Sequence, residues 1–192
     1  MATKIEYGFS ECPFGELIVA RTWDGICDVQ FLDHNRMETI HELAARWGSY
    51  TPTTQSNVMA ETVSRVIFQG YDHALTLDLR GTEFQLRVWQ ELLHIPFGET
   101  ATYLQVAERL GNAKAVRAVA TAIAQNPVAM LIPCHRVIHS DGTTGEYHWG
   151  ADLKKRLIGW EAEALRTGKA KAPKVTLRAT GQPTGMTAHD AE

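Results

Sequence analysis

The apolar positions of the first eighty residues follow the period of strands and then that of helices. Short apolar runs separated by turn residues are typical of strands, and Asp24-Gly25 between two of these runs is a hairpin signal. Apolar residues three or four positions apart then indicate two helices. We therefore expect a small α/β unit over residues 1–80. Its predicted strands are residues 5–9, 16–23, 26–32 and 74–79, and its predicted helices are residues 37–47 and 57–68.

From residue 82 onward the pattern becomes helical. Thr82-Glu83-Phe84-Gln85 has the form of a capping box, which starts a helix whose apolar face continues to Leu92. Two further helices meet at Gly111-Asn112, in the outline of a helix-turn-helix, and Asn126-Pro127 ends the second of them. We expect a mainly helical unit over residues 81–165. Its later helices are predicted at residues 102–110, 113–125 and 153–165.

The helix predicted at residues 113–125 carries one long cation on an otherwise smooth face. Arg117 shares this face with the small residues Ala120 and Thr121, whereas Val119 and Ile123 belong to the apolar face. Small side chains let a nucleic-acid backbone approach closely, and an arginine can fill a gap in a base stack. Taken alone, the helix is better explained by a solvated arginine, and the neighbouring motifs given below reverse that preference.

Charge is unevenly distributed along the 192 residues, of which 44% are hydrophobic. The net charge is -6 over residues 1–83, 0 over residues 84–165 and +3 over residues 166–192. An acidic first unit excludes broad electrostatic wrapping by nucleic acid and leaves room only for a local contact. The basic, Lys-, Ala- and Pro-containing segment 166–192 is predicted to be a disordered tail.

The cysteines and the absence of long apolar runs indicate a cytosolic protein. No apolar signal segment follows Met1, and no run approaches the roughly 20 apolar residues that span a bilayer. Three cysteines without regular spacing argue against a disulfide framework. Cys12, Cys27 and His34 also lack the spacing of metal ligands, so we expect no metal site.

The strongest chemical signal is Pro133-Cys134-His135-Arg136-Val137, which follows an apolar run. A thiol becomes a useful nucleophile when its pKa falls below the free value of roughly 8.5, and cationic neighbours can lower it. His135 and Arg136 are suitable neighbours by this argument. A buried structural cysteine beside a solvated basic pair is the alternative.

A series of short motifs extends this signal over the second unit. The motifs are Phe84-Gln85, Val88-Trp89, residues 95–100, Tyr103, residues 115–119, Asn126-Pro127, residues 133–137, Asp141-Gly142, residues 145–147 and Glu161. Together the motifs resemble the O6-alkylguanine-DNA alkyltransferases, in particular bacterial forms that include the alkyl-acceptor half of the adaptive-response regulator. The resemblance covers residues 84–165 and implies a winged-helix domain, and residues 1–80 resemble the ribonuclease H-like domain that precedes it in this family.

The resemblance implies direct repair of alkylated DNA. The second helix of the helix-turn-helix would bind the minor groove of duplex DNA, the damaged guanine would leave the helix, and Cys134 would accept the O6-alkyl group. O4-alkylthymine is the second implied lesion. A stable thioether would limit the protein to one reaction per molecule. We expect no cofactor, no membrane association and a monomer.

The resemblance also assigns roles to individual residues. His135 would take the thiol proton through a water molecule, and Glu161 would orient the histidine, as nucleophile, base and orienter generally do. Asn126 would brace the turn beneath Cys134, and Tyr103 would turn the nucleotide and donate a proton to the leaving guanine. The expected DNA contacts are Arg117, which replaces the extruded base, and Ala118, Ala120, Thr121, Tyr103 and Arg136.

Two other classes of protein share some of these features. A lesion-binding protein of the alkyltransferase-like type flips damaged guanine but lacks the acceptor cysteine, which Cys134 argues against. A Cys/His hydrolase would need neither Arg117 nor Tyr103. The regulator's transcriptional role is not expected, because its upstream cysteine cluster has no counterpart here.

The loop 140–150 is expected to close the lesion pocket. Family members present a tyrosine matching Tyr147, and some relatives have a small residue where Trp149 stands. The expected pocket residues are Tyr147, His148, Trp149, Val137 and Ser140.

We predict that Trp149 makes the pocket narrow, so that methyl adducts react well and benzyl-sized adducts poorly. The rates of thiol transfer from duplexes carrying each adduct measure this preference, and Trp149→Gly should widen acceptance. Equal rates for both adducts in the unaltered protein would refute the prediction.

Overall fold

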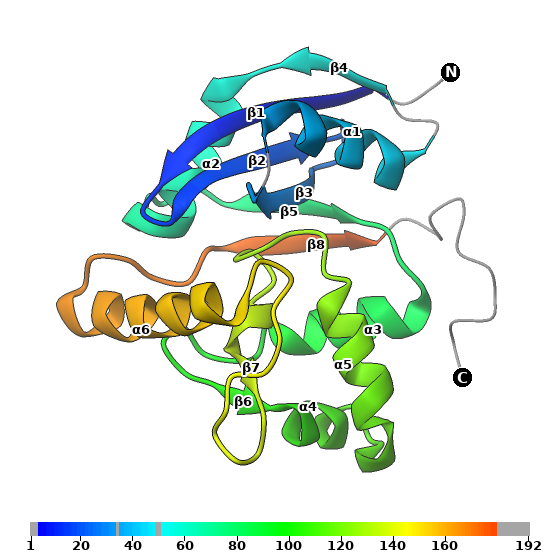
Figure 1. Cartoon of the computed structure of the whole chain (residues 1–192), viewed down its shortest axis with the longest axis vertical. Coiled ribbons are helices and arrows are strands. Elements are labelled where there is room, and N and C mark those ends of the chain that lie inside the picture. Colours follow the sequence, from blue (N-terminus) through cyan, green and yellow to red (C-terminus); the bar gives the residue numbers. More distant parts are fainter. Residues whose placement is uncertain (1–3, 34, 49–50, 180–192) are drawn as a thin grey trace.

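Alternating apolar residues place the first three strands in an antiparallel meander. The computed structural model describes residues 4–33, 35–48 and 51–179, and Figure 1 shows it as a mixed sheet above a mainly helical half. The Asp24-Gly25 hairpin is confirmed, since β2 pairs with β3 on either side of it. The sheet has six strands in the order β4-β1-β2-β3-β5-β8. They are β1 (Lys4–Cys12), β2 (Gly15–Arg21), β3 (Ile26–Phe31), β4 (Thr51–Gln55), β5 (Leu75–Leu79) and β8 (Val175–Ala179).

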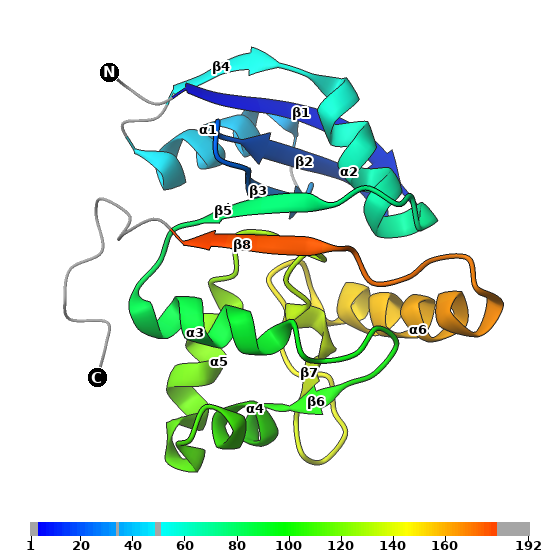
Figure 2. The same cartoon turned by 180° about the vertical axis from the view of Figure 1, so that it is seen from behind.

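Two helices cover opposite faces of this sheet, as the two views in Figures 1 and 2 show. Helix α1 (Arg36–Trp47) packs Leu43 and Trp47 against one face, and α2 (Asn57–Gln69) lies on the other. The apolar spacing predicted both helices. Met37, which shares the apolar spacing of the first helix, lies in the first turn of α1 and is exposed.

The second half contains the predicted helix-turn-helix. The capping box at Thr82 and Gln85 is confirmed by both of its hydrogen bonds. Gly111, with φ of +84°, supplies the left-handed turn after α4, where a residue with a Cβ would be strained. The elements are α3 (Glu83–Leu92), β6 (Ala101–Thr102), α4 (Tyr103–Arg109), a 3-10 turn (Ala113–Ala115), α5 (Val116–Ala124), a second 3-10 turn (Cys134–Arg136), β7 (Val137–Ile138) and α6 (Ala151–Thr167).

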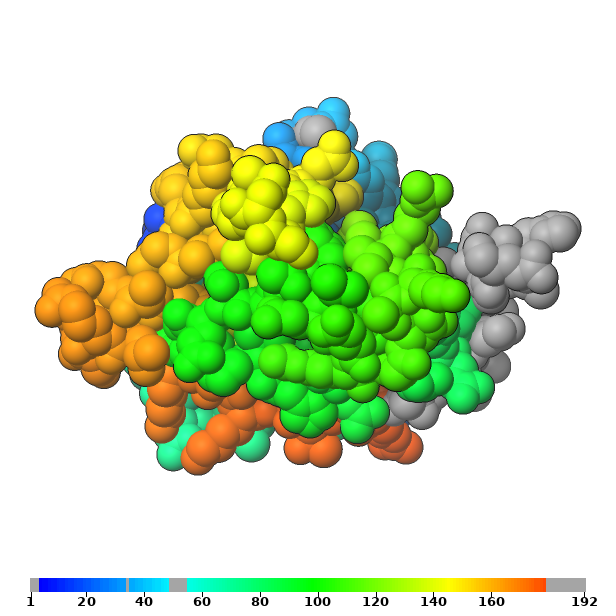
Figure 3. All heavy atoms as spheres, turned by 90° about the horizontal axis from the view of Figure 1, so that it is seen from below, coloured from blue at the N-terminus to red at the C-terminus, as the bar shows by residue number. Residues whose placement is uncertain are grey.

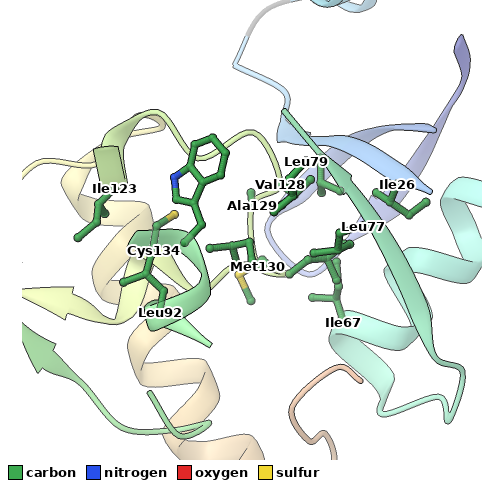
Figure 4. Packing of buried hydrophobic residues seen from close by; sticks show 14 of the residues in the cluster. Ile26, Ile67, Leu77, Leu79, Leu92, Ile123, Val128, Ala129, Met130 and Cys134 are labelled. Carbon is green, nitrogen blue, oxygen red and sulfur yellow. The ribbon is translucent and has the colours of Figure 1, made fainter. Parts of the chain in front are cut away.

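The two halves share one hydrophobic core. Val29 of β3 donates its N–H to the carbonyl of Pro127 at 2.9 Å and accepts from the N–H of Ala129 at 2.9 Å. Figure 4 shows Val128, Ala129 and Met130 between Leu77 and Leu79 on one side and Leu92, Ile123 and Cys134 on the other. The segment that carries Cys134 is therefore docked directly on the first sheet.

The prediction of a disordered tail over residues 166–192 is wrong for the part that the structure describes. Helix α6 continues to Thr167, and β8 pairs in parallel with all of β5. Lys174 and Arg178 form ion pairs with Asp72 and Asp24, so the basic residues face the acidic first unit. Residues 180–192 lie outside the described residues.

No helix in residues 4–33, 35–48 or 51–179 is long and apolar enough to cross a bilayer. Within the same ranges, no group of three or more His, Cys, Asp or Glu side chains is arranged to hold a metal ion. His34, one of the metal candidates weighed above, lies outside the described residues.

We predict that removal of β8 destabilises the protein. A chain ending at Lys174 loses a parallel strand whose half-buried Val175 and Leu177 contact the core. Since each hydrogen bond contributes about 1 kcal/mol net, we expect a loss of about 2–4 kcal/mol in the free energy of unfolding, measured by urea denaturation. A chain ending at Ala179 is the matched control, and equal stability of the two chains would contradict the prediction.

Candidate active site

A tight turn after α5 carries the chain from Asn126 to Cys134. Pro127 ends the helix, and its carbonyl accepts hydrogen bonds from the Val29 N–H and, at 3.0 Å, from Gln30 Nε2. Met130 adopts a left-handed conformation with φ of +67°, which costs a non-glycine residue about 1–2 kcal/mol. The sheet contacts and the buried apolar side chain of Met130 hold this conformation in place.

Asn126 crosses the turn and joins its two ends. Its Oδ1 accepts the Val128 N–H at 3.0 Å, and its Nδ2 donates to the Ile132 carbonyl at 2.9 Å. The same Nδ2 lies 3.2 Å from Cys134 Sγ. Asn126 is buried, so its amide both braces the turn and directs a donor at the sulfur. The structure brings these two predicted residues together.

The surroundings of Cys134 shift the pKa of its thiol in opposite directions. Burial raises the pKa of Cys134, whereas the Asn126 amide, the Lys154 ammonium and the Tyr147 hydroxyl lower it in part. The expectation that His135 and Arg136 would lower the pKa is therefore wrong. Their side chains point instead to Glu161.

Glu161 is the centre of a buried ion network. Its Oε1 lies 2.7 Å from His135 Nε2 and accepts Arg136 Nη2 at 2.9 Å, and its Oε2 accepts Arg136 Nε at 2.8 Å. The backbone N–H of Gly98 adds a contact of 3.2 Å to Oε2. Although burial raises the pKa of Glu161, the hydrogen bonds from His135 and Arg136 and the charge of Arg136 outweigh it and lower the pKa to about 2. The carboxylate is therefore ionised at neutral pH.

His135 is held as a neutral ring. Burial lowers its pKa, and the contact with Glu161 opposes this only in part. A neutral imidazole that donates from Nε2 to a carboxylate carries its free lone pair on Nδ1. Nδ1 is buried and has no hydrogen-bond partner among the described residues. His135 thus has the protonation state and tautomer of a general base.

The predicted contact between Arg136 and DNA is wrong. Arg136 is only 4% exposed, and its third nitrogen, Nη1, donates to the Ile95 carbonyl at 2.7 Å. A guanidinium with Nε, Nη1 and Nη2 all bonded to buried acceptors cannot reach a phosphate. Its role is to neutralise Glu161.

A cavity of about 490 Å³, here called the front cavity, opens beside Cys134. Tyr147, His148 and Trp149 line it as predicted, but Val137 and Ser140 do not. Val137 is buried in β7 within the core, and Ser140 is exposed outside the cavity. The lining residues are Tyr103, Ala120, Ile123, Ala124, Asn126, Cys134, His139, Glu146, Tyr147, His148, Trp149 and Lys154.

Lys154 is the functional residue that the sequence reasoning missed. It is 1% exposed, and its Nζ donates to the Tyr103 hydroxyl at 3.3 Å and to the Glu146 carbonyl at 3.4 Å. Burial lowers its pKa to about 8. The available signal was its spacing: Lys154, Leu157 and Glu161 recur at three- and four-residue intervals on the buried face of α6.

The exposed face of α5 lies next to the front cavity. Arg117, Ala118 and Thr121 are exposed, and Ala120 is half-buried at the cavity wall. Figure 3 shows this face, with α4 and α5 in green and the loop 140–150 in yellow beside them. The one arginine of α5 therefore stands on a surface of small side chains at the mouth of the site.

Comparison with known proteins decides the family. A model of the DNA-binding domain of 6-O-methylguanine DNA methyltransferase matches residues 83–163. A probable methylated-DNA--protein-cysteine methyltransferase of Acanthamoeba polyphaga mimivirus is 49% identical over 161 residues, which cover 82% of this chain and 96% of the relative. The corresponding protein of Mycobacterium leprae is 37% identical, with 82% and 92% covered. The chain belongs to the methylated-DNA--protein-cysteine methyltransferase family.

Other members of the methyltransferase family extend the comparison. The bifunctional transcriptional activator/DNA repair enzyme Ada of Escherichia coli is 40% identical over 163 residues, which cover 83% of this chain and 46% of Ada. The chain thus spans about half the length of that relative. The crystal structure of Mycobacterium tuberculosis OGT in complex with DNA aligns with a TM-score of 0.66 at 30% identity, covering 87% of this chain and 96% of OGT.

We predict that Arg136 and Arg117 have separable roles. Arg136→Met leaves Glu161 as an uncompensated buried charge and should cost about 3–5 kcal/mol of stability, without changing the salt dependence of DNA affinity. Arg117→Ala should weaken DNA binding and change stability by no more than about 0.5 kcal/mol. Urea denaturation and salt titrations of DNA binding measure both effects. If Arg136→Met kept full stability and its DNA affinity depended less steeply on salt concentration, Arg136 would be a DNA contact after all.

We also predict that Lys154 controls the reactivity of Cys134 with pH. Lys154→Gln removes a cation that lowers the thiol pKa, so alkylation of Cys134 by iodoacetamide should need a higher pH. Lys154 loses its own charge as the pH rises through about 8. The alkylation rate of the unaltered protein should therefore exceed that of Lys154→Gln most below that pH, and the difference in rate should shrink above it. The exposed neighbour Lys155→Gln is the control, and coincident profiles for all three proteins would argue against this role.

Proposed function

We propose that the protein repairs DNA by transferring the alkyl group of O6-alkylguanine to Cys134. The observation that carries the proposal is a buried thiol at the wall of the front cavity, with the Asn126 amide at 3.2 Å. The next residue in the chain, His135, is paired with Glu161. Two relatives that match 82% of this chain, over 92% and 96% of their own lengths, are named methylated-DNA--protein-cysteine methyltransferase or probable methylated-DNA--protein-cysteine methyltransferase. Methylated duplex DNA is accordingly the proposed substrate.

The first step is activation of the thiol. Neutral His135, fixed by ionised Glu161, takes the proton of Cys134 through a bridging water, and the resulting imidazolium is stabilised by the carboxylate 2.7 Å away. The Asn126 amide and the Lys154 ammonium stabilise the thiolate. Burial of the sulfur keeps the anion poorly solvated and therefore reactive.

In the transfer step, a bond forms between Cys134 Sγ and the alkyl carbon while the bond from that carbon to guanine O6 breaks. The electron pair of the broken bond passes to guanine, which needs a proton. Burial raises the pKa of Tyr103, which keeps its hydroxyl protonated but makes it a weaker acid, so donation requires support for the charge left on the oxygen. Lys154, 3.3 Å from that hydroxyl, supports the negative charge that develops on the oxygen and can replace its proton.

DNA engagement is assigned to the exposed face of α5. Ala118, Ala120 and Thr121 allow close approach to the minor groove, and Arg117 fills the stack after the damaged base has turned out. The front cavity, which Tyr147 and Trp149 line, then receives the base. O4-alkylthymine is proposed as a second substrate.

The remaining assignments concern the organisation of the molecule. We propose a ribonuclease H-like domain over residues 1–80 and a winged-helix domain over residues 81–165. The α4-α5 pair and the small β6-β7 sheet support the second assignment. The shared core and β8 mean that the two domains fold as one unit. We further propose that the protein acts as a monomer in the cytosol without a cofactor.

The proposed chemistry predicts a single turnover. A thioether does not hydrolyse, and Cys134 is the one thiol among the residues that line the front cavity. Repaired duplex should therefore accumulate to a plateau of about one equivalent per protein, a stoichiometry that follows from one acceptor thiol. Chromatography of the DNA at several protein concentrations measures it. Product that continues to form beyond that plateau, or an unchanged yield with Cys134→Ala, would contradict the proposal.

A further inference from the structure

A second cavity, here called the rear cavity, adjoins the front cavity at the end of α5. It has a volume of about 470 Å³ and is lined from the first unit by the last turn of α1. Ala124, Asn126, His148 and Trp149 line both cavities, so the two share a wall. Figure 3 shows blue atoms of the first unit beyond the yellow loop and the light green α5. The first unit therefore reaches the surface beside the proposed DNA-binding face.

Two arginines of the first unit line the rear cavity. Arg46 lies in the last turn of α1, and Arg80 follows β5 directly. The guanidinium carbon of Arg80 lies 5.3 Å from the centre of the Trp47 ring, which also lines the cavity. The side chains of Arg46 and Arg80 are 36% and 20% exposed. Since residues 1–83 carry a net charge of -6, two cations at one cavity are a local concentration of positive charge.

Asp28 orients Arg46 without occupying all of its donors. The Asp28 carboxylate is fully buried and accepts from Arg46 Nε at 3.0 Å and from Arg46 Nη2 at 3.1 Å. A guanidinium has five N–H groups, so this pairing leaves Nη1 and the second N–H of Nη2 for another anion. Arg136 differs, because its three nitrogens all donate to buried acceptors. Asp28 thus fixes the Arg46 side chain and leaves one edge of it for a ligand.

The other polar groups of the rear cavity also favour an anion. Gln125 Oε1 accepts from Gln85 Nε2 at 2.7 Å, which leaves the NH2 group of Gln125 to donate. His148 is exposed, and its ring can donate as well. Asp28 is the one acid among the lining residues, and its side chain is fully buried. A ligand therefore meets N–H donors and positive charge, which is the chemistry that binds an oxyanion.

A phosphate of DNA is the oxyanion that fits this position. In the proposed reaction a nucleotide enters the front cavity while it stays joined to its strand, so it carries a phosphate on each side. Ala124, on the wall that the two cavities share, is small and exposed, which leaves room for a strand to pass. A phosphate beyond this wall would lie next to the two arginines.

We propose that Arg46 and Arg80 form a phosphate-binding site in the rear cavity for the DNA strand that carries the lesion. The inference rests on the proposed function and adds a contact from the first unit to those of α5. The strand passes from the front cavity over Ala124, and a phosphate next to the extruded nucleotide binds the outer edge of Arg46. Arg117 near the start of α5 and Arg46 beside its end then hold the strand on both sides of the lesion.

The first test removes the cation together with its buried partner, as Asp28→Asn combined with Arg46→Gln, so that no unpaired charge is left inside. Binding to a duplex with O6-methylguanine is measured against salt concentration in a Cys134→Ala reference protein, which keeps the lesion intact. The double substitution should weaken binding about tenfold at low salt, the effect of losing a hydrogen bond to a charged group. It should also reduce the slope of log affinity against log salt by about 1.

Two matched variants show that the effect belongs to this arginine. Asp28→Asn alone keeps Arg46 and removes its neutralising partner, so affinity should equal or exceed that of the reference protein. Arg65→Gln removes an exposed arginine from α2, which covers the opposite face of the sheet, and should leave affinity and slope unchanged. If the double variant folds poorly, Arg46→Lys keeps a cation for Asp28 but lacks the second donor edge, and it should also bind more weakly.

The second test locates the phosphate. Neutral methylphosphonates replace single phosphates on either side of the lesion. One of these replacements should weaken binding to the reference protein about tenfold, by the same loss of a charged hydrogen bond. The same replacement should have no effect on the Asp28→Asn/Arg46→Gln variant, because the contact is already absent. Arg65→Gln should retain the full penalty.

The outcomes separate this inference from the proposed function. Reference affinity and slope in the double variant, or an equal methylphosphonate penalty in both proteins, would overturn the phosphate site. Weaker binding with an unchanged salt slope would show a purely structural role for Arg46 and would overturn it too. Transfer of methyl to Cys134 is measured separately in the protein that keeps this cysteine. Coupling of Arg46 to one phosphate without any transfer would retain the site and overturn the function.

Discussion

The buried carboxylate of Glu161 is the interaction on which the rest of the site depends. A charge removed from water must be paired and hydrogen-bonded, and four donors from two segments meet this need: His135 Nε2, Arg136 Nε and Nη2, and the Gly98 N–H. Since His135 and Arg136 follow Cys134 directly, the pairing fixes the turn that carries the thiol against α6. It also settles the tautomer of His135. The need to pair the Glu161 carboxylate therefore determines both the position of the Cys134 sulfur and the choice of His135 as its base.

The first sheet supplies the second constraint. Backbone hydrogen bonds from β3 to Pro127 and Ala129 hold the turn from the opposite side, and Asn126 closes it toward the sulfur. Phe31, at the end of the same strand, reaches the loop over the front cavity through Trp149. The sheet has no residue in the proposed chemistry. Its contribution is to position the two segments between which the damaged base would enter.

Much of the fold could be predicted from the sequence where local signals were strong. The hairpin at Asp24-Gly25, the capping box at Thr82 and the helices with regular apolar spacing all appear in the structure. Strands β4 and β8 were not predicted. β4 consists of polar residues and a proline and has no apolar alternation, whereas β8 alternates over residues 175–178 but lies in the basic segment that was assigned to a disordered tail. Both depend on pairing with strands far away in the chain.

The residues of the site divide in the same way into those that local motifs predicted and those that only the fold reveals. Cys134, Asn126, His135 and Glu161 could be placed because their motifs are distinctive. Arg136 was assigned to DNA because a basic residue in a sequence looks solvated, and only the fold shows that its charge is needed inside. Lys154 was passed over for the same reason. In both cases the buried partner comes from another segment, so charge alone could not distinguish a surface cation from an internal one.

The central claim is that the environment around Cys134, and not thiol chemistry in general, makes one cysteine the alkyl acceptor. The protein has two other free thiols, Cys12 and Cys27, which serve as internal references. Exposure to a duplex containing isotope-labelled O6-methylguanine, followed by peptide mapping by mass spectrometry, locates the label. The account predicts the whole label as a thioether at Cys134, with none at Cys12 or Cys27. Label spread over the three cysteines, or an unmodified Cys134 beside repaired DNA, would contradict it.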